Sequence, residues 1–269
     1  MNSLPVFVRR ASRQQVIGGV IIVCLALFAV VVPLFAGDPL TQDLDHTLAW
    51  PSVSQPMGTD HLGRSVLARL SNAARLSLSV ALISVATAAL SGAATGILAA
   101  WRGGWSERVL VAIGDVVLAV PGLLLVILMT VLAPGESWPF YVGLSAAMWV
   151  EHFRIVRAAS RSLLASPQVE ASRLLGFGPF YIVRRHLAPE LAPMLATLTI
   201  FGAATAVVSL ATLGLVGLGV RPPTPELGRL IIESLPHYRE APWLVSAPVA
   251  LLAITVVALA LVADREESL

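Results

Sequence analysis

Long apolar stretches alternate with short polar segments along the whole chain. A helix needs about 20 mainly apolar residues to cross a bilayer. Six stretches approach or exceed that length, and they run Val16–Phe35, Leu78–Ala100, Leu110–Leu132, Tyr141–Val156, Leu191–Leu215 and Leu244–Val262. Inside lipid a single segment can satisfy its own backbone hydrogen bonds only as a helix. The pattern therefore predicts an all-α, polytopic membrane protein with six transmembrane helices.

Composition supports this class and excludes a soluble domain. The chain is 57% hydrophobic and 13% charged, and its mean hydropathy is +0.82, far from the balance of a soluble globular protein. Arg9, Arg10 and Arg13 precede the first apolar stretch, as basic residues do in a signal peptide. That stretch is longer than the apolar region of a signal peptide and lacks a clear cleavage site, so we predict an uncleaved first span.

The arginines set the expected orientation, because the chain contains no lysine. With the N-terminus inside the cell, the cytoplasmic arginines are Arg9, Arg10, Arg13, Arg102, Arg108, Arg154, Arg157, Arg161, Arg173, Arg184, Arg185 and Arg265. The external ones are Arg64, Arg69, Arg75, Arg221, Arg229 and Arg239. Positive residues concentrate on the cytoplasmic side of membrane proteins. Residues 1–15 and 264–269 are therefore predicted to be cytoplasmic ends that flank a membrane domain at residues 16–263.

A polar insert at about residues 166–190 separates the fourth and fifth stretches. Glu170–Leu175 predicts one short helix, and Gly176–Pro179 predicts a turn. Phe180–Leu187 predicts a second helix, which Pro189 is expected to end. Such a two-helix element would project from the bundle toward a soluble partner. An ordinary amphipathic loop between spans is the alternative interpretation.

Two glycine-containing segments are predicted to lie outside the cell. Gly58–Arg64 reads as a turn and leads into an amphipathic helix at Ser65–Ser77, for which a place on the membrane surface is one interpretation. The second segment is Val220–Gly228, which ends a glycine- and proline-rich run that begins at Gly214. The Gly-x-x-Gly-x-Gly spacing of this run follows a membrane helix and not a strand, so a nucleotide site is not predicted.

Two features lie within the apolar stretches. Gly92 and Gly96 stand four residues apart, which lets helices approach closely, and we expect this packing inside one subunit. Asp115 stands about two turns into the third stretch, with Pro121 in the same predicted helix. A carboxylate at that depth is expected to face protein or a water-filled path. Substrate or proton coupling and a structural hydrogen bond to a neighbouring helix are both open explanations.

These segments together resemble a known family over nearly the whole chain. Glu170-Ala171-Ser172, followed by Gly176 and Pro189, is similar to the "EAA" loop of permease subunits of binding-protein-dependent ABC importers. The run Gly-Thr-Asp-His-Leu-Gly-Arg from Gly58 resembles the second permease of dipeptide, oligopeptide and nickel importers. So do the Asp-x5-Pro spacing from Asp115 and the run Leu-Gly-Val-Arg-Pro-Pro-Thr-Pro-Glu from Leu218.

The resemblance implies a function and a set of partners. The chain would be a permease in the inner membrane of a bacterial cell, forming half of a pore for a small solute such as a peptide, nickel or a metal-chelating opine. Its partners would be a second homologous permease, two cytosolic ATPase subunits and an external substrate-binding protein. ATP and magnesium would bind to the ATPase subunits, and this chain would hold no cofactor. Lipid is its medium, and nucleic acid is not an expected partner, because no basic patch is interleaved with aromatic residues.

The resemblance also implies candidate site residues. The ATPase-coupling loop would use Glu170, Ala171, Ser172, Gly176, His186 and Pro189. The dock for the external binding protein would use Thr59, Asp60, Arg64, Arg221, Pro222, Pro223 and Glu226. Asp115 is the candidate polar group of the pore. A secondary transporter that couples to protons through Asp115 is the alternative function.

No catalytic chemistry is predicted for this chain. A phosphate-binding Gly-x4-Gly-Lys loop requires a lysine, and neither Gly-x-Ser-x-Gly nor His-Glu-x-x-His occurs. The five histidines are dispersed without metal-ligand spacing, and they are His46, His61, His152, His186 and His237. Those expected outside the cell, His46, His61 and His237, could meet a metal cargo. Cys24 is the only cysteine, so no disulfide forms within the chain.

Overall fold

The computed structural model describes residues 12–133 and 136–264. Arg9, Arg10 and Arg265, which contribute to the predicted orientation, lie outside the described residues. The α-helices of the described part are α1 Arg13–Phe35, α2 Val66–Arg102, α3 Gly104–Leu118, α4 Gly122–Leu132, α5 Trp138–Leu164, α6 Pro167–Leu174, α7 Pro179–Ile182, α8 Ala188–Leu215, α9 Leu227–Ser234 and α10 Trp243–Ala263. Shorter turns lie at Leu44–His46, Val183–Leu187 and Leu235–His237. The predicted all-α class is confirmed.

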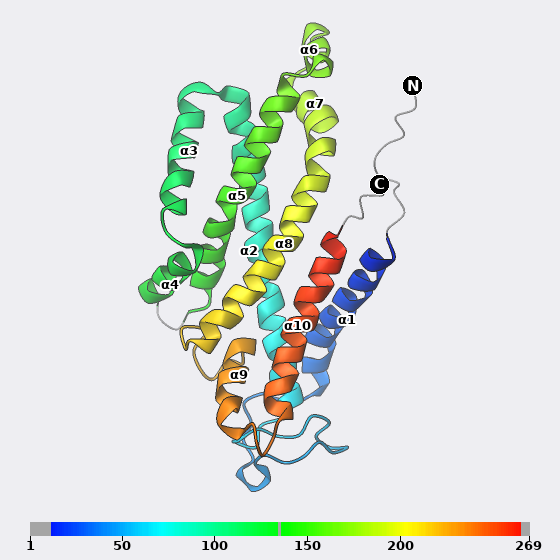
Figure 1. The fold of residues 1–269 in the computed structure, drawn as a ribbon, viewed down its shortest axis with the longest axis vertical. Coiled ribbons are helices and arrows are strands. Elements are labelled where there is room, and N and C mark those ends of the chain that lie inside the picture. Colours follow the sequence, from blue (N-terminus) through cyan, green and yellow to red (C-terminus); the bar gives the residue numbers. More distant parts are fainter. Residues whose placement is uncertain (1–11, 134–135, 265–269) are drawn as a thin grey trace.

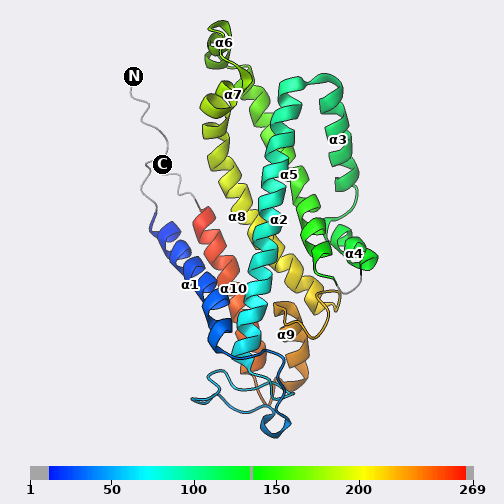
Figure 2. The same cartoon turned by 180° about the vertical axis from the view of Figure 1, so that it is seen from behind.

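The long helices run along the molecule, and the short ones close its two ends (Figure 1). α6 and α7 form one end, while the loop of residues 36–65 and α9 form the other. The start of α1 and the end of α10 lie toward the α6 end in both views. Seen from behind, α2 lies in front of α5 (Figure 2), so α2 covers the back of α5.

The third predicted span is broken in the structure. α3 ends at Leu118, α4 begins at Gly122, and the two helices are bent by 85°. Pro121 lies at the junction, in the position before the first residue of α4. Proline has no amide hydrogen to donate, and it disfavours the helical conformation in the residue before it. The prediction of one helix that continues through Pro121 is therefore wrong.

The structure does not reproduce the count of six spans exactly. By length and composition, four described helices are able to cross a membrane, or five if the bent pair α3–α4 is one span. α5 is not among them although it has 27 residues. Glu151, Arg154 and Arg157 lower its apolar character, and α5 is instead packed against α2, α3, α4 and α8.

α2 is one continuous helix of 37 residues. The amphipathic stretch Ser65–Ser77 is therefore its first part and not a separate helix on the membrane surface. The Ser65 side chain caps the helix by accepting a hydrogen bond from the Ala68 amide. The apolar face of this part is buried against α9 and α10, because Leu70 and Ala73 cluster with Leu227 and Leu230 of α9, and Leu251 of α10 packs on the same cluster. No glycine or proline interrupts the sequence between Val66 and Ser91, which explains why the helix continues.

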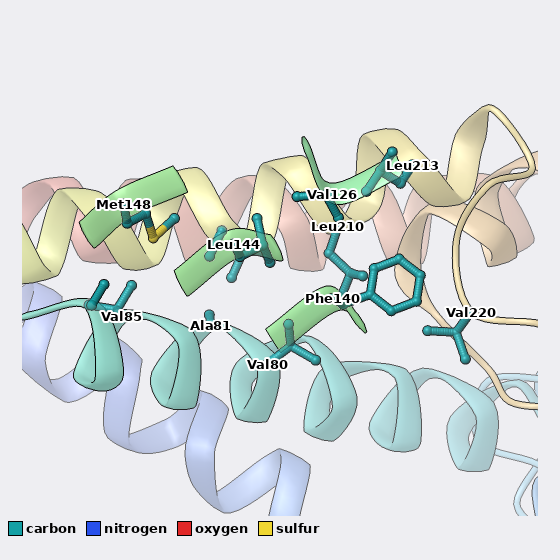
Figure 3. Close-up of a cluster of buried hydrophobic side chains, with 13 residues drawn as sticks. Val80, Ala81, Val85, Val126, Phe140, Leu144, Met148, Leu210, Leu213 and Val220 are labelled. Atoms are coloured by element: carbon teal, nitrogen blue, oxygen red, sulfur yellow. The ribbon is translucent and has the colours of Figure 1, made fainter. Parts of the chain in front are cut away.

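The main apolar core joins α2, α4, α5 and α8 (Figure 3). Its labelled side chains are Val80, Ala81, Val85, Val126, Phe140, Leu144, Met148, Leu210, Leu213 and Val220. Next to this core, two glycines bring α2 close to α5. A Cβ atom added at Gly92 would lie 2.6 Å from the Cβ of His152, and one at Gly96 would lie 2.9 Å from the Cβ of Val156. The predicted close packing within one subunit is confirmed.

The glycines of residues 214–228 also serve close packing. Gly217 has a φ of +81° and ends α8, with the Leu218 amide donating to the Leu213 carbonyl at 2.8 Å. A Cβ atom added at Gly228 would overlap the carbonyl oxygen of Ala211, and one at Gly214 would overlap the Glu226 carboxylate. The glycine spacing therefore lets α9 lie directly against the end of α8.

Candidate functional site

The polar insert forms a compact projection, which we call the knob and define as residues 166–190. Its first helix, α6, ends at a glycine with left-handed backbone, since Gly176 has a φ of +81°. The Phe177 amide donates to the Ser172 carbonyl at 3.1 Å, and the Gly176 amide donates to the Arg173 carbonyl at 3.0 Å. This pair of bonds is the Schellman arrangement, in which glycine carries no steric penalty. The predicted turn at Gly176 is thus confirmed.

The second predicted helix does not end at Pro189. α7 continues through a π-helical turn, Val183–Leu187, directly into α8, so that Pro189 lies in the first turn of α8. The Ala188 amide donates to the Val183 carbonyl, five residues back. A wider turn accommodates a residue that has no amide hydrogen and whose ring needs room. The prediction that Pro189 ends the helix is wrong, and a continuous helix joins the knob to α8.

Contacts inside the knob connect α6 to the π-helical turn. The Ser172 hydroxyl lies 2.9 Å from His186 Nε2 and donates to the Gln168 carbonyl at 2.9 Å. The rings of Phe177 and Tyr181 stack with their centroids 4.1 Å apart. At its base the knob buries Val169, Ile182 and Leu187 in one apolar cluster with Val156 of α5 and Leu191 of α8. Two of the predicted coupling residues, Ser172 and His186, therefore hold the knob together.

The tip of the knob exposes large apolar side chains. Leu174, Leu175 and Phe180 are 84%, 76% and 77% exposed. Other exposed residues of the knob are Glu170, Ala171, Arg173, Gly176, Arg184, Arg185 and Pro189. A hollow of about 470 Å³ beside the tip is lined by Trp101, Arg173, Gly176, Phe177, Pro179 and Ile182. Apolar side chains rimmed by charges are typical of a surface that contacts another protein.

At the opposite end a network of ion pairs joins the 36–65 loop to α2 and α9. The Asp60 carboxylate accepts hydrogen bonds from Arg64 Nε at 2.7 Å and from Arg69 Nη1. Arg69 also donates from Nη2 to Glu233 Oε2 at 2.8 Å, and Arg229 donates from Nε to Glu233 Oε1 at 2.7 Å. Asp60, Arg64 and Arg69 are buried. We call these five residues the ion-pair network.

The network keeps its carboxylates ionised. Burial alone would raise the pKa of Asp60, but the charge of Arg69, the amides of Leu62 and Arg64 and the charge of Arg64 outweigh it. The pKa of Asp60 consequently lies below its ordinary value. The pKa of Glu233 is also lowered, because hydrogen bonds and charge from Arg69 and Arg229 exceed the effect of burial.

The structure corrects the composition of the predicted external dock. Thr59, Asp60, Arg64 and Glu226 are only 2%, 4%, 7% and 0% exposed, so they offer no surface to a soluble partner. Thr59 accepts from the Ala49 amide at 2.9 Å. Glu226 caps α9 by accepting from the amides of Gly228 and Arg229, and burial raises the pKa of its carboxyl. Arg221, Pro222 and Pro223 are exposed and stay candidates for the dock.

Sequence reasoning missed Arg69, Arg229 and Glu233 as partners in the ion-pair network. The spacing of Arg229 and Glu233, four residues apart on one helix, was the available signal. Nothing local connects Arg69 with Glu233, because the two are 164 positions apart in the chain.

Asp115 is exposed near the end of α3, and among the described residues its side chain has no hydrogen-bond partner. The structure therefore does not show the predicted bond to a neighbouring helix. Of the histidines predicted to lie outside the cell, His46 pairs with Asp43 at 2.8 Å, and His61 stacks on His237 with ring centroids 5.4 Å apart. Within the described residues no three His, Cys, Asp or Glu side chains gather as metal ligands would.

Comparison with known proteins identifies this architecture. The profile of the family described as "Binding-protein-dependent transport system inner membrane component" matches residues 92–265. The Di/tripeptide transport system permease protein DppC of Pseudomonas aeruginosa is 32% identical, over 94% of this chain and 86% of its own length. The Oligopeptide transport system permease protein OppC of Bacillus subtilis is 30% identical, over 95% and 84%. The Dipeptide transport system permease protein DppC of Haemophilus influenzae is 29% identical, over 96% and 90%.

A solved structure shows the same fold. One chain of the inward-facing MetNI methionine ABC transporter aligns with a TM-score of 0.57 and 26% identity, covering 73% of this chain and 93% of its own. A membrane helix bundle with a projecting knob thus defines a transport subunit of the inner membrane. The chain belongs to the family of binding-protein-dependent transport system inner membrane components, and it is a permease subunit of an ABC importer. The comparisons give no support to the alternative of a proton-coupled secondary transporter.

Proposed function

We propose that this chain forms half of the pore of an ATP-driven importer of peptides. The peptide permeases among its relatives support this cargo over nickel or a metal-chelating opine. A second homologous permease would supply the other half of the pore. Two cytosolic ATPase subunits would bind ATP and magnesium, and an external binding protein would deliver the peptide.

The exposed apolar tip of the knob is the observation that supports ATPase binding. Leu174, Leu175 and Phe180 stand at the α6 end of the bundle, and in the isolated chain they would be in contact with water. A soluble subunit that covers them gains the free energy of apolar burial, about 25 cal/mol per Å². Because the knob continues into α8, movement of the ATPase subunits would be transmitted to a long helix of the bundle. This is a rigid-body switch between two arrangements.

Gly176→Asp is expected to reduce co-purification of the ATPase subunits about tenfold. A side chain at a φ of +81° costs about 1–2 kcal/mol, so the free knob should leave the conformation that the ATPase subunit binds. Restoring that conformation on binding at a cost of about 1.4 kcal/mol weakens the affinity about tenfold. Gly178→Asp is the matched control, because Gly178 has a φ of −75° and no atom within 4 Å of an added Cβ. Glu170→Ala should act in the same direction but more weakly, since an exposed carboxylate in the first turn of α6 contributes only about 0.3–1 kcal/mol.

The readouts are co-purification of the ATPase subunits and ATP-driven uptake into vesicles. Normal assembly and normal uptake with both Gly176→Asp and Glu170→Ala would show that the knob is not the coupling element. Uptake that runs on a proton gradient without any ATPase subunit would refute the proposed function as a whole.

The knob is proposed to be cytoplasmic, and the α9 end is proposed to face outward. In a background with Cys24 replaced by serine, Thr224→Cys should react with a membrane-impermeant thiol reagent added outside the cell, since Thr224 is exposed. Thr59→Cys should stay unreactive until the protein is denatured, because Thr59 is 2% exposed. Reaction of Thr224→Cys only after the membrane is opened would reverse the proposed orientation.

A further inference from the structure

Three charged side chains stand on the α3–α5 helix pair away from the side that α2 covers, and we call them the charged face. They are Asp115 on α3, and Glu151 and Arg154 on α5, and all three are exposed. Among the described residues, their side chains form no hydrogen bond or ion pair. The face of α5 that α2 covers carries His152, Phe153 and Val156, which are buried. The charged face is thus on the side of α5 that the bundle leaves open.

Contact between α3 and α5 brings the two carboxylates to one level. A Cβ added at Gly114 would lie 3.3 Å from Val150 Cγ1, so these residues face each other. Asp115 and Glu151 each follow the contacting residue by one position, a rotation of about 100°. α3 and α5 run in opposite directions (Figure 1), and the two rotations therefore turn both side chains to the same side of the helix pair. Arg154 stands one turn further along α5 on that side.

The charged face lies at the middle of α5, because Glu151 is about 20 Å from either end of the helix, at about 1.5 Å per residue. In the predicted span Tyr141–Val156, Glu151 lies inside the membrane and Arg154 lies near the cytoplasmic end. Charged groups within a membrane span are costly to expose to lipid, and they face protein or water-filled cavities. In Figure 1, α5 lies between α3 and α8 and not at the outer edge of the bundle.

We infer that the charged face lines the translocation path and binds the two ends of a zwitterionic peptide, an inference that rests on the proposed function. Asp115 and Glu151 supply negative charge that matches an N-terminal ammonium group, and the Arg154 guanidinium matches a C-terminal carboxylate. Peptides of different sequence share only their backbone and these two ends. Recognition of the ends therefore serves a pore that must pass many side chains.

The test compares uptake of three peptides by the whole importer in proteoliposomes: trialanine, N-acetyl-trialanine and trialanine amide. The double variant Asp115→Asn, Glu151→Gln is expected to lower uptake of trialanine and trialanine amide about tenfold, the effect of losing about 1.4 kcal/mol. It should leave N-acetyl-trialanine at the wild-type rate. Arg154→Gln should lower uptake of trialanine and the acetylated peptide but spare the amide. Each rate is divided by the wild-type rate for the same peptide, which cancels the preference of the binding protein.

Arg108→Gln is the control, because Arg108 is an exposed charge near the start of α3 and outside the charged face. For each of the three peptides, the uptake rate of Arg108→Gln should equal the wild-type rate. If the wild type shows no ATP-driven uptake of trialanine, the proposed function fails, and the inference fails with it. If the wild type transports trialanine but the charged-face variants affect all three peptides equally or not at all, the proposed function stands and the inference is overturned. If the charged-face variants lose the second permease during purification, the charged face is a contact between the two permeases, and the inference is likewise overturned.

Discussion

Arg69→Met is expected to lower the free energy of unfolding by about 3–5 kcal/mol, the range for breaking a buried ion pair by removing one partner. Arg69 is 4% exposed and donates to both Asp60 and Glu233. Methionine has a similar length, so the main change is the loss of charge and of both donors. Asp60 would then keep Arg64 as its only charged partner within the network, in a buried setting. The thermal midpoint of the purified protein in lipid nanodiscs should fall by on the order of 10 °C.

Arg75→Met is the matched control, since Arg75 lies on the same helix but is exposed and forms no ion pair within the described residues. Its thermal midpoint should stay close to that of the wild type, because exposed charges contribute about 0–1 kcal/mol. Equal midpoints for Arg69→Met and Arg75→Met would mean that the ion-pair network does not stabilise the α9 end of the bundle.

Replacement by alanine is expected to change the stability of the protein in opposite directions at two helical glycines, Gly96 and Gly19. At Gly96 an added Cβ would lie 2.9 Å from Val156 Cβ and 3.0 Å from the Phe153 carbonyl oxygen, so α2 and α5 must move apart. Overpacking of this kind costs about 1–3 kcal/mol. At Gly19, in α1, nothing lies within 4 Å of an added Cβ. Alanine there should stabilise the helix by about 0.5–1 kcal/mol, since it restricts the unfolded chain and favours helix.

Thermal unfolding of Gly96→Ala and Gly19→Ala under the same conditions measures the contrast. Gly96→Leu should destabilise the protein much more than Gly96→Ala, because a longer side chain enters the same contact with α5. A gain in stability at Gly96 equal to that at Gly19 would show that α2 and α5 do not approach as closely as the structure indicates.

Two prolines show how far local sequence predicts helix ends. Pro121 stands in an apolar stretch where one continuous helix was predicted, and Pro189 stands in the polar insert where a helix end was predicted; the structure reverses both predictions. Pro121 separates α3 from α4, which are bent by 85°. Pro189 lies inside a continuous helix, because the π-helical turn Val183–Leu187 leaves room for its ring. The outcome depends on how the neighbouring turn packs, and residues far away in the chain decide that packing.

The candidate site was predictable in part for a similar reason. The knob forms from residues close in sequence, so its turn at Gly176 follows from glycine chemistry alone. The segment Gly58–Arg64 was predicted to be an exposed dock, because polar residues in a loop usually face water. Asp60 and Arg64 are buried instead, since α2 and α9 bring Arg69 and Glu233 to them.

The sequence by itself determined the membrane class, the helical architecture and the knob between two long helices. Long apolar runs leave the backbone no other way to satisfy its hydrogen bonds in lipid, and that requirement is local. Tertiary structure alone decided that Asp60 belongs to a buried ion-pair network and that Asp115, Glu151 and Arg154 share one open face. Those results depend on which helices lie side by side, because burial and charge pairing arise from contacts between segments far apart in the chain.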